Sequence, residues 1–167
     1  LFLSLSFFSA FPQKQPADYV DPFICTQGDH GQWLPAALVP YGLVEVCPDT
    51  YPGSLIGGTD YAHSGYDFSD NQVRGFSNFH KGSSGNSGIK DRAGLLSIIP
   101  FVNATDSLFK NAVIDIDKAT EKATPGYYSV ILTKEQIRAE LTADTHVALH
   151  RYSFQEKTHP QLFIFEG

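Results

Sequence analysis

The sequence predicts an all-β fold, an antiparallel β-sandwich, on three observations. Segments in the second half alternate apolar and polar residues, which is typical of strands with one buried face. Such short segments recur roughly every ten residues with turn residues between them, a spacing typical of sandwiches and barrels. No stretch shows the periodicity of an amphipathic helix.

Each strand is predicted from its own pattern. Residues 137–144 alternate without interruption, and residues 127–133 begin after the turn signal Pro125-Gly126. Residues 95–102 form a continuous apolar run, which indicates a strand buried on both faces. Residues 117–122 (DKATEK), where the alternation of 112–117 ends, are compatible with a single helical turn and are predicted as a hairpin loop. The remaining predicted strands are 38–47, interrupted at Pro40, 75–79, 112–117, 146–154 and 162–165.

Composition places the chain among globular domains and argues against two kinds of partner. The 167 residues are enough for one domain with its own core, and 42% of them are hydrophobic. The formal charge is −6 with no basic run, which argues against a nucleic-acid partner. No apolar run after the signal-like start of the chain is long enough for a membrane span.

Both ends of the chain are predicted to be truncated. Residues 1–15 begin with the apolar, Ser-rich run LFLSLSFFSA, which is typical of a truncated signal peptide and predicts a secreted or periplasmic protein. A buried strand or helix is the alternative for this run. The domain proper is predicted over 19–167, where the chain stops in an apolar strand. Cys25 and Cys47 are the only cysteines, and either a disulfide or two free thiols is compatible with their positions.

The segment 60–88 is the most informative part of the chain. It is rich in Asp, His, Gly, Ser and aromatic residues, too polar for a core and too aromatic for a disordered linker. An ordered loop of this kind is predicted to bind a ligand, and sugars suit it because rings cover C–H patches while carboxylates accept hydrogen bonds from hydroxyls. The candidate sugar-binding residues in this segment and in the nearby GDHGQW sequence are His30, Trp33, Asp60, Asp67 and Asp70.

These candidates have structural alternatives. Asp side chains in Gly- and Ser-rich loops commonly bond backbone N–H groups in turns, and Trp33 is equally suited to capping the core. Paired carboxylates would serve glycoside hydrolysis, but the sequence does not give the separation of the acids in this segment. His30, His63 and His80 lack the close spacing of zinc ligands.

Several short motifs occur in a fixed order along the chain. Each motif alone is a weak signal, but the whole series in this order is a specific one. The motifs are YVDPF (19–23), HG (30–31), LPAALVPYGLVEVCPDT (34–50), SGYDFSD (64–70), GFSNFH (75–80), ATPGYYSV (123–130), and IRAELTA with HRYSF (137–154). Together they resemble the N-terminal domain of glycoside hydrolase family 92, the exo-acting α-mannosidases common in gut Bacteroidetes. The resemblance spans about residues 19–167.

The resemblance implies a supersandwich-like domain that packs on a larger C-terminal α/α barrel, expected beyond residue 167. It implies calcium-dependent hydrolysis of mannose-containing glycans, such as N-glycans or mannan, with inversion at the anomeric carbon. The catalytic acid and base and the main calcium ligands are then expected in the barrel, so no catalytic residue is assigned to this chain. The loop with Ser64, Tyr66 and Asp67, and the segment that ends at His80, would face the pocket between the two domains.

Two departures from the family pattern bear on specificity. Asp60 stands where many members have a Trp that holds the leaving sugar in enzymes cutting α-1,2 linkages, which argues against an α-1,2 preference. Trp33 stands where the family has a smaller residue, and it offers a replacement stacking surface. Two other functions stay open: a stand-alone carbohydrate-binding module, and a purely structural domain that supports the barrel.

Overall fold

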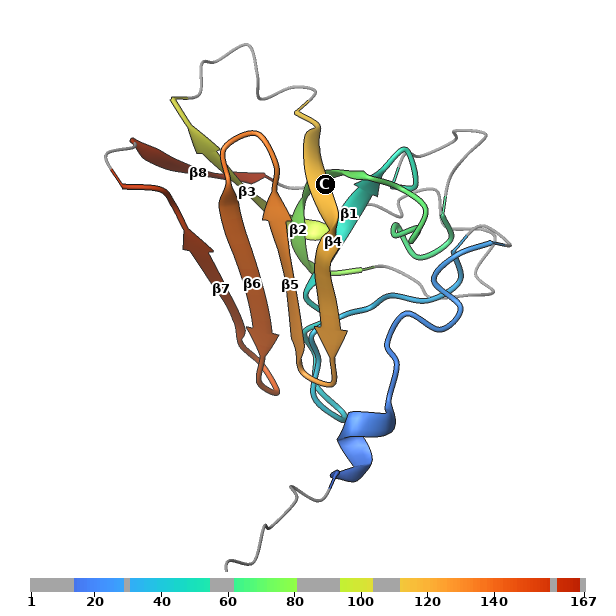
Figure 1. Cartoon of the computed structure of the whole chain (residues 1–167). Helices are drawn as coiled ribbons and strands as arrows, with labels where there is room; N and C mark the ends of the chain where they lie inside the picture. Colours follow the sequence, from blue (N-terminus) through green and yellow to red (C-terminus); the bar gives the residue numbers. More distant parts are fainter. Residues whose placement is uncertain are drawn as a thin grey trace, which may run out of the picture.

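The computed structural model describes residues 14–28, 31–54, 62–80, 94–103, 112–156 and 159–165. Within these ranges the chain forms one short 3-10 helix and eight strands, which confirms the predicted all-β class (Figure 1). The elements are η1 (Pro16–Tyr19), β1 (Cys47–Tyr51), β2 (Gln72–Phe79), β3 (Leu95–Val102), β4 (Ile114–Thr124), β5 (Tyr127–Leu132), β6 (Ile137–Ala143), β7 (Ala148–Ser153) and β8 (Pro160–Phe165).

The strands form one antiparallel sheet that curls into a sandwich. Its hydrogen-bonded order is β7-β6-β5-β4-β2-β3-β8, with β1 paired to β2 outside this path. β4 joins the two halves, since its first residues pair with β2 and the strand pairs with β5 from Ile116 onward. The curl brings β7 over β2, where the rings of Phe76 and Tyr152 lie 5.9 Å apart. The predicted antiparallel sandwich is therefore confirmed, and Figure 1 shows β5 and β6 in front of β2 and β3.

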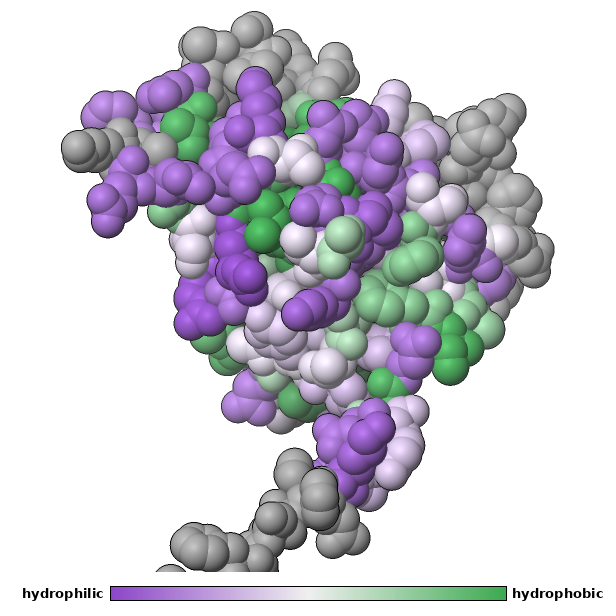
Figure 2. Space-filling view, in the orientation of Figure 1, coloured by the Kyte–Doolittle hydropathy of each residue, from purple (hydrophilic) through white to green (hydrophobic). Residues whose placement is uncertain are grey.

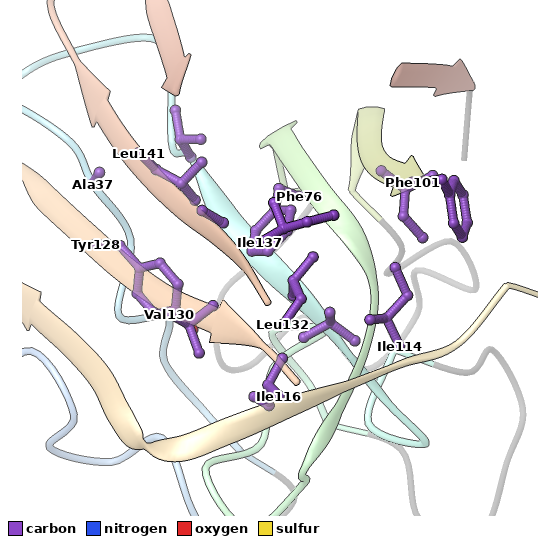
Figure 3. Close-up of a cluster of buried hydrophobic side chains, with 14 of the residues drawn as sticks. Ala37, Phe76, Phe101, Ile114, Ile116, Tyr128, Val130, Leu132, Ile137 and Leu141 are labelled. Atoms are coloured by element: carbon purple, nitrogen blue, oxygen red, sulfur yellow. The ribbon is translucent and has the colours of Figure 1, made fainter. Parts of the chain in front are cut away.

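One apolar core fills the space between the two halves of the sheet. Strands β5 and β6 alternate as the sequence predicts, with every second side chain turned inward. Figure 3 shows Phe76, Leu132 and Ile137 gathered between the strands. On the outside of the same strands, Figure 2 shows hydrophilic and apolar groups mixed. The buried strand residues are Val73, Phe76, Ile99, Phe101, Ile114, Ile116, Tyr128, Val130, Leu132, Ile137, Ala139 and Leu141.

Two strand predictions are wrong in detail. The predicted strand 38–47 does not form over 38–46, because a turn with a positive φ of 61° at Tyr41 follows Pro40 and leaves only an isolated bridge between Ala37 and Val46. Its last residue, Cys47, is the first residue of β1. The apolar run of β3 is not buried on both faces, since Leu96 is 41% exposed.

The two cysteines are free thiols, with Cys25 exposed and Cys47 buried, so the disulfide alternative is excluded.

Residues 117–122, predicted as a hairpin loop, lie inside β4. The register with β5 shifts here, so that residues 118–121 bulge from the strand opposite a single residue. Thr120 holds the bulge: its Oγ1 donates to the carbonyl of Asp117 at 2.7 Å and accepts from the N–H of Ile131 at 3.0 Å. The broken alternation therefore marks a bulge, and the chain reverses only after β4, at the Pro125-Gly126 turn.

Candidate functional site

The loop 62–70, between β1 and β2, is tied to two segments that precede it in the chain. The N–H of Phe68 donates to the carbonyl of Thr26 at 2.9 Å, and the N–H of Thr50 in β1 donates to the carbonyl of Gly65 at 3.1 Å. Backbone groups of an irregular segment need such partners when they leave water. The 62–70 loop is therefore an ordered part of the fold.

Ser64 is buried and bonds the backbone around it. Its Oγ lies 3.0 Å from the carbonyl oxygen of Gly31 and 3.1 Å from those of Trp33 and Tyr66. The N–H of Tyr66 donates to the same Oγ at 3.3 Å. Because a hydroxyl has one proton, Ser64 donates to one of these three carbonyl oxygens at a time, while its oxygen accepts from the N–H of Tyr66. Ser64 thus joins the 62–70 loop to the segment that carries Trp33.

Tyr66 is fully buried and points from the loop to the sheet. Its hydroxyl donates to Glu121 Oε1 at 2.7 Å, and the hydroxyl of Tyr128 in β5 donates to the same oxygen at 2.6 Å. Lys118 forms an ion pair with Glu121 and donates to the Tyr66 hydroxyl at 3.5 Å. Burial and the carboxylate of Glu121 raise the pKa of Tyr66, so its hydroxyl stays protonated.

The acids of the loop accept hydrogen bonds from groups within the domain. Asp67 is half-buried, and its Oδ1 accepts from the N–H of Ser69 at 2.8 Å and from its Oγ at 2.6 Å. Asp70 Oδ2 accepts from Thr50 Oγ1 at 2.7 Å and from the N–H of Gly53 at 2.9 Å. Burial raises the pKa of Asp70, although these two hydrogen bonds oppose the rise. The turn-forming alternative describes the contacts of Asp67, whereas Asp70 joins the loop to Thr50 and Gly53, which precede it in the chain by 20 and 17 residues.

His80 follows β2 and contacts a buried carboxylate. Its Nε2 lies 3.1 Å from Asp49 Oδ1. Asp49 also accepts from the N–H of Gly94 at 3.1 Å, from Ser97 Oγ at 3.2 Å and from Ser77 Oγ. The side chains of His80 and Asp49 are only 1% and 5% exposed. In the described part of the chain this network is internal to the domain, and ligand contact by His80 stays a prediction.

Trp33 and Phe68 expose aromatic surface at the site, with 53% and 36% of their area accessible. The ring of Phe68 lies 5.0 Å from that of Phe23, and Lys118 Nζ lies 4.2 Å from its centroid, so the ring has a neighbour from each of two other segments. Together with the half-buried carboxylate of Asp67, these rings offer the apolar faces and the acceptor that sugar binding requires. His30 and Asp60 lie outside the described residues.

Sequence analysis missed the charged residues that organise this site. Lys118 and Glu121 fall in the segment taken for a hairpin loop, and Glu121 lies 55 residues from its partner Tyr66. The broken alternation at 117–122 was the available signal for a bulge. For Asp49, the signal was an acid in a segment with several apolar residues, LVEVCPDT, which also holds Glu45.

Metal-ligand clusters and membrane-spanning helices are both absent from the described ranges. These ranges contain no group of three or more His, Cys, Asp or Glu side chains placed to hold a metal ion. None of their helices has the length and apolarity of a membrane-spanning segment. The described site therefore offers hydrogen bonds and aromatic faces to a ligand, and the residues present do not fit a calcium site.

Comparison with known proteins relates the chain to one glycosidase family. The glycosyl hydrolase family 92 N-terminal domain matches residues 19–165. An uncharacterised secreted glycosidase of Arthroderma benhamiae is 29% identical over 142 residues, which cover 81% of this chain and 17% of that protein. The match extends over nearly all of the predicted domain.

Two solved structures from Bacteroides thetaiotaomicron share the fold. The family GH92 α-mannosidase BT3965 is 26% identical with a TM-score of 0.72, over 89% of this chain and 20% of its own. The family GH92 inverting mannosidase BT2199 is 27% identical with a TM-score of 0.69, over 91% of this chain and 20% of its own. The chain therefore spans about a fifth of the length of these enzymes.

Proposed function

The chain belongs to glycosyl hydrolase family 92, as an N-terminal domain, and we propose that it forms one wall of the substrate site of a larger α-mannosidase. The observation that carries this proposal is the family match over residues 19–165, joined to the fold shared with two mannosidases. Because the chain spans about a fifth of those enzymes, the catalytic acid and base are proposed to lie in the rest of the polypeptide, in an α/α barrel that is this domain's partner.

The proposed substrates are mannose-containing glycans, such as N-glycans or mannan. A relative, BT3965, has been solved in complex with mannoimidazole, which supports a mannose-type ligand. On this chain the exposed rings of Trp33 and Phe68 and the carboxylate of Asp67 are proposed to meet the glycan, together with His30 and Asp60. The remaining candidates, Ser64, Tyr66 and His80, are proposed to shape this surface from below.

The proposed reaction of the whole enzyme is a single displacement by water with inversion, in line with the description of BT2199 as inverting. Calcium is proposed as the cofactor on the family resemblance alone. Since the described residues do not fit a calcium site, its ligands are proposed to lie in the barrel. A secreted or periplasmic location is proposed from residues 1–15, of which 1–13 lie outside the described ranges, and from the relative called secreted.

The burial of Ser64, Tyr66 and the His80 side chain favours a second function, that of a structural domain which supports the barrel. The two functions differ in what a surface substitution does. Loss of the Trp33 ring would raise KM if this domain binds substrate. The same change would leave KM unaltered if the domain only supports folding.

Hydrolysis by the full-length polypeptide tests the proposal. Mannobioses with α-1,2, α-1,3 and α-1,6 linkages are incubated with the enzyme, and proton NMR records mannose release and the anomer formed first. We expect β-mannose as the first product, loss of activity with EDTA and recovery with calcium. Trp33→Ala is expected to raise KM, while Tyr41→Ala, at a fully exposed turn, serves as the aromatic control. No mannose release from any linkage would contradict the proposed activity.

A further inference from the structure

We propose that Glu121, with Lys118 beside it, is a positioning residue that sets the 62–70 loop and the ligand surface it carries; this inference rests on the function proposed above. It arises from one juxtaposition in the fold. The bulge of β4 turns two charged side chains toward Tyr66, which lies in a loop remote from them in the chain. Bulges next to binding sites commonly redirect side chains in this way.

The bulge has its own internal support. The N–H of Ala119 donates to Asp117 Oδ1 at 3.1 Å, and Thr120 bonds both its own strand and β5. Lys118 and Glu121 are then paired at the two ends of the bulge. Because the sheet fixes the positions of Lys118 and Glu121, the 62–70 loop that they contact is fixed relative to the sheet.

Glu121 joins the loop to the sheet at a single oxygen. Its Oε1 accepts from Tyr66 on the loop at 2.7 Å and from Tyr128 in β5 at 2.6 Å. The Glu121 side chain is 1% exposed, so both bonds lie away from water. Charge-assisted hydrogen bonds of this kind are directional and strong. They fix the Tyr66 ring relative to β5.

A buried carboxylate is a poor choice for stability alone. Apolar side chains of similar volume usually stabilise a core as well as a buried ion pair does, because the charges lose their hydration. What Lys118 and Glu121 contribute instead is a fixed position for the side chains of the 62–70 loop. Lys118 Nζ lies 4.2 Å from the ring of Phe68, two residues beyond Tyr66, and so holds an exposed ring of the loop.

Two tyrosine variants of the full-length enzyme form a matched test. Tyr66→Phe and Tyr128→Phe each remove one buried hydroxyl from the same Glu121 oxygen, but only Tyr66 lies in the loop. We expect Tyr66→Phe to lower kcat/KM on an α-mannobiose about tenfold, mainly through KM, because small displacements of binding groups have large effects. Tyr128→Phe should stay within about twofold of wild type. Glu121→Gln, which keeps an acceptor, should be milder than Glu121→Ala.

Hydrogen exchange measured by mass spectrometry provides a readout independent of activity. Peptides covering 62–70 should exchange faster in Tyr66→Phe than in Tyr128→Phe, with equal melting temperatures within a few degrees as the condition for comparison. Equal effects of the two variants on KM and on loop exchange would overturn the inference. An inactive wild-type enzyme would instead refute the proposed function, and the exchange data would still decide the positioning role. If Tyr66→Phe does not fold, Glu121→Gln is compared with Tyr128→Phe instead; the change at Glu121 also weakens the bond from Tyr66, so only Glu121→Gln is expected to raise KM and to speed exchange of 62–70.

Discussion

Acidification is expected to destabilise this domain through one buried histidine, His150 in β7. Its Nε2 lies 2.6 Å from Asn78 Oδ1 in β2, and its Nδ1 lies 2.9 Å from the hydroxyl of Tyr152. Both partners are neutral, and burial lowers the pKa of His150 from 6.5 to about 4. The fold therefore favours the neutral imidazole, which donates from one nitrogen and accepts at the other.

The sign and size of the effect follow from linkage. Because the folded state binds the proton of His150 more weakly than the unfolded state, stability falls as pH drops from about 6.5 to about 4. The full difference between the two pKa values corresponds to about 3.4 kcal/mol, and about 2 kcal/mol of it is lost between pH 7 and pH 5. Solvent reaches the half-buried ring on an edge strand, which reduces the expected loss to about 1–2 kcal/mol.

Urea denaturation at pH 7 and pH 5 measures this loss. His150→Gln keeps one donor and one acceptor but does not titrate in this range, and His146→Gln is the control at an exposed position. Wild type and His146→Gln should lose about 1–2 kcal/mol more than His150→Gln on acidification. Contributions of other groups cancel in this comparison, including Asp70, whose raised pKa acts in the opposite direction. Equal losses in wild type and His150→Gln would refute the reasoning.

The carboxylate of Asp49 accepts hydrogen bonds from four neighbours. Asp49→Ala is therefore expected to lower the free energy of unfolding, measured by urea denaturation, by about 3–5 kcal/mol. A loss below about 1 kcal/mol would argue against this role of Asp49. Iodoacetamide should modify exposed Cys25 in the native protein and Cys47 only in denaturant, because Cys47 is fully buried and burial raises its pKa; equal labelling of both would contradict this. Gly31→Ala should lower the free energy of unfolding by about 1–3 kcal/mol more than Gly28→Ala does. Both glycines have positive φ, but only at Gly31 would a Cβ collide with the 62–70 loop. Equal melting temperatures of the two variants would contradict this prediction.

Much of the fold was predictable because strand burial leaves a period of two in the sequence. Residues 137–144 alternate without interruption and residues 127–133 follow the Pro125-Gly126 turn signal, and both became strands within one residue of the predicted ends. Residues 117–122 were not predictable in the same way. A broken alternation fits either a loop or a bulge, and only the register with β5 distinguishes them.

The site was predictable in its location and less so in its internal chemistry. The polar, aromatic composition pointed to the 62–70 loop, but its buried contacts join residues far apart in sequence. Ser64 bonds Gly31, 33 residues away, and Tyr66 bonds Glu121, 55 residues away. Pairings of this range leave no periodic signal in a single sequence, so the roles of the buried residues became visible only in the fold.

The burial of polar side chains in the 62–70 loop bears directly on how a ligand surface is made. An irregular loop leaves backbone N–H and C=O groups without strand partners, and Ser64 and Thr50 supply several of these partners from inside. Because these backbone groups have partners inside the domain, the Phe68 side chain lies on the surface while the loop stays ordered. Because the exposed ring follows the anchored Tyr66 by two residues, a change at a buried anchor displaces the surface as well. Substitutions at Ser64 should therefore alter stability and binding together, whereas substitution of Phe68, which loses only its contacts with Phe23 and Lys118, should alter binding more than stability.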